Sequence, residues 1–528
     1  MKQYNIAQIG AFDYENLGDI LFTDVLHRQL EKRIPIGKHM LFALNEVKKP
    51  LSESDSTVYG IDRLEEMHLA VHFDAVIIGG GDLIRFDSAV APEDNYSSHN
   101  TTFDLIFSPV MVCAKYNIPL IWNAPGVPLE FTAQQGKIID ASLAHVDLAA
   151  VRDNPSMERI KPYSNHPVEV CPDTVLSMSE VIDLTEYSEK VKAQFPVLNG
   201  EYVVFQSFPS HQSTCSTYHS DLVSGLREVL KKHKLVLLTI GRIHHDDVFL
   251  NALEKELDSE NVTVIDIDNT FEISAVLQGA SAFIGTSLHG NIISNSYGVP
   301  SIILDVIGFI KTKGYFELMG RNDYVVSDAS IMGDVLEKML EDKKLERLPD
   351  LKAQVNTHFD RIASLITEGK TKSSPLLPFL RAVYSPEKEL NFFLRFLADG
   401  ELMTTKVAQD NDAQVDMILT PPASSKVITV SPCENSICLL RDVKITADGK
   451  EIKYKTSGIK TNGDIFFCSP VQDLKFKSAS QVHISFRVLF LPRNEQYNEL
   501  YHQVLLSTNG IKRNLKTFIY FIKSKLKR

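Results

Sequence analysis

Short apolar segments that end in glycine alternate with helical patterns along most of this chain. The segments YNIAQIG (4–10), DAVIIGGG (74–81) and IPLIWNAPG (118–126) are typical of buried strands, and apolar side chains recur at helical spacing from Asp19 to Arg33. Strands that alternate with amphipathic helices predict βαβ units and a parallel sheet. We therefore expect a first Rossmann-like, doubly wound α/β domain over residues 1–175.

The alternation starts again after about residue 200. YVVFQSF (202–208), LVLLTIG (235–241) and AFIGTS (282–287) are further expected strands, and a charged helical region from Leu336 to Ile366 closes this part. A second Rossmann-like domain is expected over residues 176–370. Two such domains in tandem form a cleft between the carboxyl ends of their strands, where open α/β sheets bind ligands.

The pattern changes after residue 370. A polar, proline-bearing stretch begins the segment 371–409, which we interpret as a linker with a short helical stretch to about Asp399. Residues 410–510 alternate with period two and are divided by Asp-Gly and Asn-Gly turns, which predicts an antiparallel β-sandwich-like unit. Residues 511–528 contain seven basic and no acidic residues, typical of a basic amphipathic tail. Such a tail either lies on an anionic membrane or docks on its own β unit.

Composition excludes several classes of protein. The formal net charge of −12 argues against a nucleic-acid binder, and none of the six cysteines forms a CxxC motif, so no zinc or redox site is indicated. The metal-ligand types at 244–247 are consecutive and cannot all point inward, and we expect neither metal nor cofactor. Because we see no signal peptide and no apolar run of about 18–20 residues, we expect a cytoplasmic protein.

Two glycine-containing motifs follow strands of the first domain. In GAFDYENLGD (10–19), Asn16 and Gly18 lie where an anion would meet free backbone N–H groups, and Asp19 is a plausible helix N-cap. In IIGGGDLI (77–84), the glycines allow a ligand or a helix to approach the backbone closely, and Asp82 is expected to face the cleft. A turn without a ligand is the alternative interpretation of each motif, and spacing alone favours it for the first.

Two further motifs contain charged or titratable side chains. Arg152 is followed directly by Asp153, which predicts a salt-bridged structural pair. In FIGTSLHGNIISNSYGVP (283–300), a strand ends at Gly285, and His289 lies at the start of a short helix that faces the cleft. An imidazole suits proton transfer near neutral pH. Basic side chains that are available to support such a site are Arg242, Lys311, Lys313 and Arg321.

At these motifs the chain resembles the polysaccharide pyruvyl transferase family. The resemblance covers about residues 5–330 and rests on the order and spacing of four motifs: Asn16-Leu17-Gly18-Asp19, Gly79-Gly80-Gly81-Asp82-Leu83, Arg152-Asp153 with Ser156, and Ser287-Leu288-His289-Gly290 with Gly298-Val299-Pro300. It implies two Rossmann-like domains similar to the glycosyltransferase-B architecture. It also implies transfer of the enolpyruvyl unit of phosphoenolpyruvate onto two hydroxyls of a sugar, as a ketal, in bacterial surface-glycan biosynthesis.

The resemblance and the motifs together give each candidate residue an expected role. The catalytic candidates are His289 and Asp19, and the acceptor-binding candidates are Asp82 and Arg152. The donor or phosphate would be bound by Asn16, Gly18, Gly80, Gly81, Arg242, Ser287, Gly290 and Lys313. The expected partners are phosphoenolpyruvate and a sugar or lipid-linked glycan acceptor, the latter at the inner face of the cytoplasmic membrane if the tail binds there.

One departure from the family pattern leaves the donor open. Many members have arginine immediately before Leu-His-Gly, and here Ser287 stands in that place. A glycosyltransferase that uses a nucleotide-sugar donor is therefore an alternative on the same fold. A non-catalytic glycan-binding or scaffold protein is a third, which the β unit favours by analogy only.

Overall fold

The computed structural model describes residues 2–13, 16–47, 57–86, 102–207, 217–241, 245–306, 308, 310–342, 345–370, 379, 390–396, 401–407, 412–421, 423–431, 438–461, 463–467 and 473–490. The described residues up to 370 belong to one compact unit, and those from 379 onward belong to a second. The first unit contains both Rossmann-like domains and all of the candidate residues that the structure describes.

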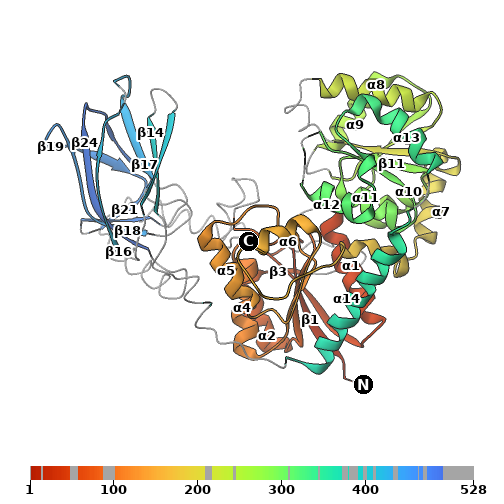
Figure 1. The fold of residues 1–528 in the computed structure, drawn as a ribbon, viewed down its shortest axis with the longest axis horizontal. Coiled ribbons are helices and arrows are strands. Elements are labelled where there is room, and N and C mark those ends of the chain that lie inside the picture. The colour runs from red at the N-terminus through yellow and green to blue at the C-terminus, as the bar shows by residue number, and fades with distance from the viewer. Residues whose placement is uncertain are drawn as a thin grey trace. The chain divides into compact units, whose positions relative to one another are not determined.

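The first sheet is wholly parallel, with strand order β3-β2-β1-β4-β5-β6-β7. Its strands β1 and β3 are labelled in the lower part of Figure 1. Its strands are β1 (Tyr4–Ile9), β2 (Ile36–Ala43), β3 (Val58–Gly60), β4 (Ala75–Gly79), β5 (Leu120–Asn123), β6 (Leu148–Val151) and β7 (Glu169–Val170). The helices between them are α1 (Leu17–Glu31), α2 (Leu64–Val71), α4 (Asp104–Tyr116), α5 (Ala133–Leu143) and α6 (Asn154–Ile160). The expected βα alternation of the first domain is thus confirmed.

The second sheet repeats this topology, with strand order β10-β9-β8-β11-β12-β13 and parallel pairing throughout. Its strands are β8 (Val203–Gln206), β9 (Leu235–Leu238), β10 (Val262–Ile265), β11 (Ala282–Gly285), β12 (Ser301–Leu304) and β13 (Val325–Val326). The helices are α7 (Thr185–Gln194), α8 (Tyr218–Leu230), α9 (Asp246–Leu257), α10 (Thr270–Gln278), α11 (Leu288–Ser296), α12 (Ile310–Met319), α13 (Met332–Glu341) and α14 (Leu348–Glu368).

Each sheet reverses its winding direction once, and this decides where a ligand can bind. In the first sheet the reversal lies between β1 and β4, and in the second it lies between β8 and β11. Helices that leave such a pair of strands go to opposite faces of the sheet, which opens a crevice at the carboxyl ends of the strands. The motifs at 10–19, 77–84 and 283–300 follow three of these four strands.

Two segments tie the domains together. The 3-10 helix η2 (Thr174–Glu180) crosses from β7 toward the second domain, and α14 returns to pack on α1 and η2. Arg33, two residues beyond the end of α1, binds this returning helix, with Nε 2.6 Å from Asp360 Oδ1 and Nη2 3.1 Å from Asn356 Oδ1. His358 Nε2 lies 3.1 Å from Asn123 Oδ1 at the end of β5. Polar contacts therefore hold α14 against the first domain at two places.

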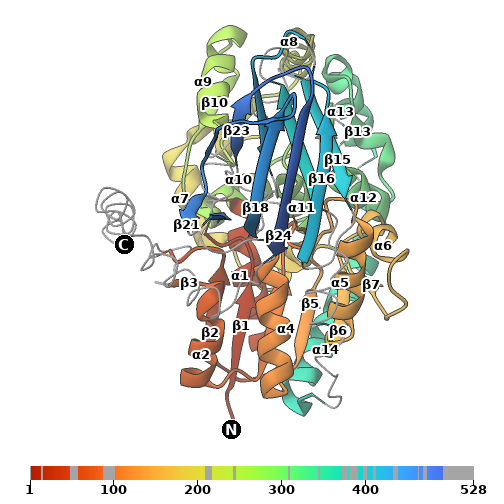
Figure 2. The same cartoon turned by 90° about the vertical axis from the view of Figure 1, so that its left-hand side faces the viewer.

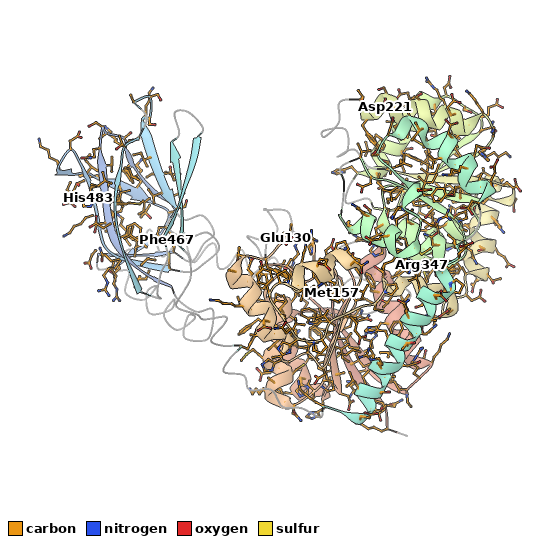
Figure 3. The ribbon with its side chains drawn as sticks, viewed as in Figure 1. Glu130, Met157, Asp221, Arg347, Phe467 and His483 are labelled. Carbon is orange, nitrogen blue, oxygen red and sulfur yellow. The ribbon has the colours of Figure 1, made fainter. Side chains whose placement is uncertain are left out.

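The second unit contains two antiparallel sheets, with strand orders β15-β14-β17-β23-β20 and β16-β24-β18-β22-β21. The strands are β14 (Leu390–Phe396), β15 (Glu401–Val407), β16 (Asp412–Leu419), β17 (Val427–Ser431), β18 (Cys438–Ala447), β19 (Lys450–Glu451), β20 (Tyr454–Thr456), β21 (Ile459–Thr461), β22 (Asp464–Phe467), β23 (Leu474–Lys477) and β24 (Val482–Phe490). Figure 2 shows β16, β24 and β18 as neighbouring strands. Phe467 is buried in the core of this unit, whereas His483 is partly exposed (Figure 3).

One expectation for this part is wrong. Where the sequence suggested a helical stretch before Asp399, β14 and β15 form a hairpin, with Leu390 opposite Val407 and Phe396 opposite Glu401. The β14 sequence LNFFLRF is rich in aromatic and large apolar residues, and pairing with β17 overrides any local helical preference. The predicted tail 511–528 lies outside the described residues. Among the described helices, none is long and apolar enough to cross a membrane.

Candidate active site

The N-terminus of α1 is capped by Asn16. Its backbone is extended, and its Oδ1 accepts a hydrogen bond of 3.1 Å from the backbone N–H of Gly18. The expectation that Asp19 caps this helix is therefore wrong, because the asparagine amide already reaches the free N–H two residues on. Asp19 is instead the third helical residue, where the helix dipole favours a carboxylate.

Gly18 brings the first domain against the imidazole of His289. A Cβ atom on Gly18 would lie 1.9 Å from His289 Nδ1, 2.1 Å from Cγ and 2.2 Å from Cε1. Three nearly equal distances mean that Gly18 packs over the face of the ring rather than at its edge. Only glycine leaves room for this contact, so two motifs that are about 270 residues apart in sequence meet here.

The N-terminus of α11 is held by a buried polar network. Ser287 Oγ accepts a hydrogen bond of 3.1 Å from Gly290 N, and Ser287 N donates to Gln206 Oε1 at 3.0 Å. Gln206 Nε2 lies 3.4 Å from Asp246 Oδ2, and Asp246 is fully buried. Ser287 thus caps the helix that begins with Leu288, and His289 lies in its first turn, as the sequence predicted.

Asp173 approaches the other side of the imidazole. Its Oδ2 lies 3.6 Å from His289 Nε2, and neither of these buried atoms has a hydrogen-bond partner among the described residues. Phe22 packs edge-to-face on the ring, with centroids 5.4 Å apart and an interplanar angle of 84°. The His289 side chain is 13% exposed, so the ring is confined but open to solvent along part of its surface.

The triple-glycine turn after β4 packs beneath α1. Gly80 and Gly81 have φ angles of +91° and +68°, which side chains rarely adopt. A Cβ atom at Gly80 would lie 2.2 Å from the ring of Phe22, and one at Gly81 would lie 2.6 Å from Asp19 Oδ1. Both the backbone angles and the space therefore require glycine, and the turn places Asp82 beside Asp19.

A cluster of buried charges surrounds Asp82. Arg152, 5% exposed, donates a hydrogen bond to Asp82 Oδ1, and its Nε lies 3.3 Å from Asp153 Oδ2. The predicted Arg152–Asp153 pair is therefore present, and Asp82 extends it. Lys311 Nζ lies 3.6 Å from Asp82 Oδ2. Burial raises the pKa of the Asp82 carboxyl, but the charges of Arg152 and Lys311 outweigh it and hold that pKa below its ordinary value.

Asp19 is shifted in the opposite direction. Burial raises the pKa of its carboxyl to about 6, and the negative charge of Asp82 adds to this effect. The positive charges of His289 and Lys311 oppose the rise without cancelling it. Asp19 is therefore the carboxyl in this cluster that can carry a proton near neutral pH, which makes it a second candidate for proton transfer.

Lys311 reaches the cluster because α12 docks on α6. A Cβ atom on Gly314 would lie 2.9 Å from Asp153 Cβ, so the two helices touch at this glycine. Asp305 fixes the start of α12, where its Oδ2 accepts a 2.8 Å hydrogen bond from Thr312 Oγ1. Both Lys311 and Lys313 are exposed, but Lys311 is the lysine that lies beside Asp82.

The structure brings most of the predicted residues into one connected site. The residues it joins are Asn16, Gly18, Asp19, Gly80, Gly81, Asp82, Arg152, Ser287 and His289. Gly290 instead packs against Phe283 of β11, where a Cβ would lie 2.5 Å from its ring. Arg242 lies outside the described residues. Sequence reasoning assigned no role to Asp173, although it follows an edge strand of the first sheet in the segment Cys171-Pro172-Asp173.

Comparison with known proteins assigns the chain to a family. The sequence profile of the polysaccharide pyruvyl transferases matches residues 16–306, which is more than half of the chain. The chain belongs to the polysaccharide pyruvyl transferase family. The matched range begins at the cap of α1 and ends just after β12, so it contains every described candidate except Lys311, Lys313 and Arg321. As a member of this family, the protein is a transferase.

Solved structures are similar to the chain only at low identity. UDP-GlcNAc 2-epimerase of Methanocaldococcus jannaschii is 14% identical with a TM-score of 0.47, covering 70% of this chain and 100% of that chain. UDP-GlcNAc 2-epimerase from Neisseria meningitidis is 12% identical with a TM-score of 0.45, covering 69% and 99%. A glycosyltransferase from Rickettsia africae is 12% identical with a TM-score of 0.44, covering 73% and 100%. Comparison with curated proteins finds no match.

Proposed function

We propose that this protein transfers the pyruvyl group of phosphoenolpyruvate onto two hydroxyls of a sugar, in surface-glycan biosynthesis. The methylene carbon of the donor gains a proton, and the two sugar oxygens form bonds to its C2. The bond between C2 and the phosphate oxygen breaks. Of the two hydroxyl protons that leave the sugar, one balances the new methyl group and the other leaves with inorganic phosphate. The product is a cyclic ketal that carries one carboxylate.

The observation that carries this proposal is the contact between Gly18 and the face of His289. It joins a titratable ring to the N-terminal turn of α1, while His289 itself lies in the first turn of α11. Helix N-termini bind phosphate through free N–H groups and the helix dipole. Two such termini beside one imidazole supply both an anion-binding place and a group that moves protons, and the transfer reaction needs both.

The charges around Asp82 suit an anionic donor. Phosphoenolpyruvate carries a phosphate and a carboxylate, and Lys311 is partly exposed beside the cluster, at 43%. Arg152 is already bound to Asp82 and Asp153, so we assign it to holding this cluster rather than to direct donor contact. Asp19, with its raised pKa, is placed to exchange a proton with an acceptor hydroxyl near neutral pH.

The test replaces His289 with glutamine and follows phosphate release from phosphoenolpyruvate in the presence of a glycan acceptor. Loss of a proton-transfer group lowers turnover by roughly 10²–10⁴-fold. His219→Gln is the matched control, because His219 is a partly exposed residue of α8 that pairs with Glu256 at 2.7 Å. Loss of less than tenfold in folded His289→Gln protein would remove His289 from the mechanism.

A nucleotide-sugar donor is the second candidate, and Ser287 is the observation that favours it. Ser287 carries no charge, and its hydroxyl is occupied in capping α11. Thermal shift separates the two donors, since a ligand at 100 times its Kd stabilises a protein by about 2.7 kcal/mol. Protection by phosphoenolpyruvate, with none by nucleotide sugars, supports pyruvyl transfer. Protection by nucleotide sugars, with none by phosphoenolpyruvate, would establish a glycosyltransferase instead.

We also propose, from the sequence alone, that residues 511–528 bring the enzyme to a lipid-linked acceptor. Each basic residue near an anionic surface contributes on the order of 1 kcal/mol, and seven are present. The full chain should sediment with anionic vesicles at low salt and should remain in solution with neutral ones. A chain that ends at Gly510 should not sediment with either, and equal sedimentation of both chains would contradict this role.

A further inference from the structure

Asp173 is a buried carboxylate whose two oxygens have different surroundings. Its side chain is 3% exposed and caps η2, where Oδ1 accepts a hydrogen bond of 3.1 Å from Val175 N. Oδ2 has no hydrogen-bond partner among the described residues and lies 3.6 Å from His289 Nε2, which has none either. Buried polar atoms without a partner are rare in folded proteins, so two that face each other indicate a functional pair.

We infer that Asp173 is a positioning residue that holds the neutral His289 ring with its proton on Nε2, so that Nδ1 is the nitrogen that exchanges protons with substrate. An ionised carboxylate accepts hydrogen bonds and donates none, so it favours the tautomer in which the nearer nitrogen bears hydrogen. A separation of 3.6 Å is slightly longer than a hydrogen bond, and such contacts often shorten when substrate binds.

The surroundings of the ring differ at its two nitrogens. Nε2 is buried, so the exposed 13% of the side chain lies on the rest of the ring. Gly18 lies over one face of the ring on its Nδ1 side, and the edge-to-face contact with Phe22 restricts rotation of the ring. A ring that cannot turn over keeps Nε2 toward Asp173, and Nδ1 is the other nitrogen that can act.

Charged and titratable groups surround this pair on both sides. The positive charge of Arg152 interacts with Asp173, and Cys171 and Tyr315 are further titratable neighbours. On the imidazole side, Asp19 and Asp82 are the further carboxylates that interact with His289. Arg152 partly balances the negative charge, which reduces the cost of keeping Asp173 charged in a buried place.

The contact between Asp173 and His289 depends on how the two Rossmann-like domains are arranged. It lies at the start of η2, the segment that crosses between the Rossmann-like domains and contacts α1, α11 and α14. His289 belongs to the second domain and Gly18 to the first. A shift between the domains would therefore alter the distance from Asp173 to His289, so tautomer control depends on the assembled site.

The test uses Asp173→Asn in the full chain, because asparagine retains an Oδ1 that can accept from Val175 N while the charge is lost. The matched control is Asp328→Asn, since Asp328 also caps a 3-10 helix and accepts from Ser330 N at 2.9 Å. Nitrogen NMR of protein labelled in histidine reports the tautomer without any substrate. The His289→Gln variant assigns the signal.

The wild-type ring should show the Nε2–H tautomer, and Asp173→Asn should shift it toward Nδ1–H while Asp328→Asn leaves it unchanged. A wild-type Nδ1–H tautomer, or no shift in Asp173→Asn, would overturn the inference, and the wild-type spectrum decides even if the variant fails to fold.

In the transfer assay, which rests on the proposed function, kcat of Asp173→Asn should fall between about 10²-fold and about 10⁴-fold with KM little changed. An equal loss in both variants would indicate a merely structural role. If wild-type protein shows the expected tautomer but no transfer, the proposed function fails and the positioning role stands.

Discussion

Replacing Gly18 with alanine should damage catalysis far more than stability. The added Cβ would lie 1.9 Å from His289 Nδ1, about 1.6 Å short of a normal contact of about 3.5 Å. The imidazole or the N-terminus of α1 must then move by more than 1 Å. A misplacement of about 1 Å can cost about 10²-fold in rate, so we expect kcat to fall by roughly 10²-fold.

The expected change in stability is small because two effects oppose each other. Overpacking a buried contact costs about 1–3 kcal/mol, whereas alanine is better than glycine in a helix by up to about 1 kcal/mol. Gly333→Ala is the matched control, since its Cβ would lie 2.8 Å from Glu228 Cβ in a helix contact of the second domain. Phosphate release and thermal unfolding are measured for both variants. Turnover within threefold of wild type in folded Gly18→Ala would refute the contact.

Three further predictions concern the charged cluster and the two units. Burial raises the pKa of Asp19 from 3.8 to about 6, so the stability of the wild-type protein falls as the pH rises through this interval. Asp19→Asn should therefore unfold at a higher temperature than wild type at pH 8, but not at pH 3.5. An equal difference in unfolding temperature at both pH values would contradict the raised pKa. Lys311→Met removes the cation 3.6 Å from Asp82, and in steady-state kinetics it should raise the KM for phosphoenolpyruvate about tenfold. Lys313→Met should change this KM less than twofold. Equal effects on KM would show that the two lysines act alike. A chain of residues 1–376 contains the whole first unit. It should unfold cooperatively, and donor should still protect it in a thermal melt. Aggregation of this chain would show that the first unit does not fold independently of the second.

The α/β part of the fold could be predicted because its signals are local. The segment Ala75–Gly79 is a continuous apolar run followed by glycines, and the helical spacing after Leu17 leaves few alternatives to a βα unit. The order of such units then limits the topology to a parallel sheet. The β14–β15 hairpin could not be predicted, because its pairing with β17 joins residues that are more than thirty positions apart.

The candidate site could be predicted only in part, for a similar reason. Strand ends in both domains indicated His289 and Asp82, since carboxyl ends of parallel strands meet at one edge of a sheet. Asp173 could not be assigned a role from sequence, because its partner lies more than a hundred residues away in the other domain. The choice between Lys311 and Lys313 depends on how α12 docks at Gly314, and the helical pattern alone does not reveal this contact.

The central claim is that the protein forms a pyruvate ketal, and product analysis tests it most directly. Phosphoenolpyruvate labelled with carbon-13 is incubated with the protein and the lipid-linked glycan fraction of its source cells, and the glycans are analysed by mass spectrometry. We expect one labelled pyruvyl group per modified sugar, one phosphate released per ketal, and no product with His289→Gln. If the glycan carries no label after incubation with labelled phosphoenolpyruvate, and the protein transfers sugar from a nucleotide sugar under the same conditions, pyruvyl transfer is contradicted.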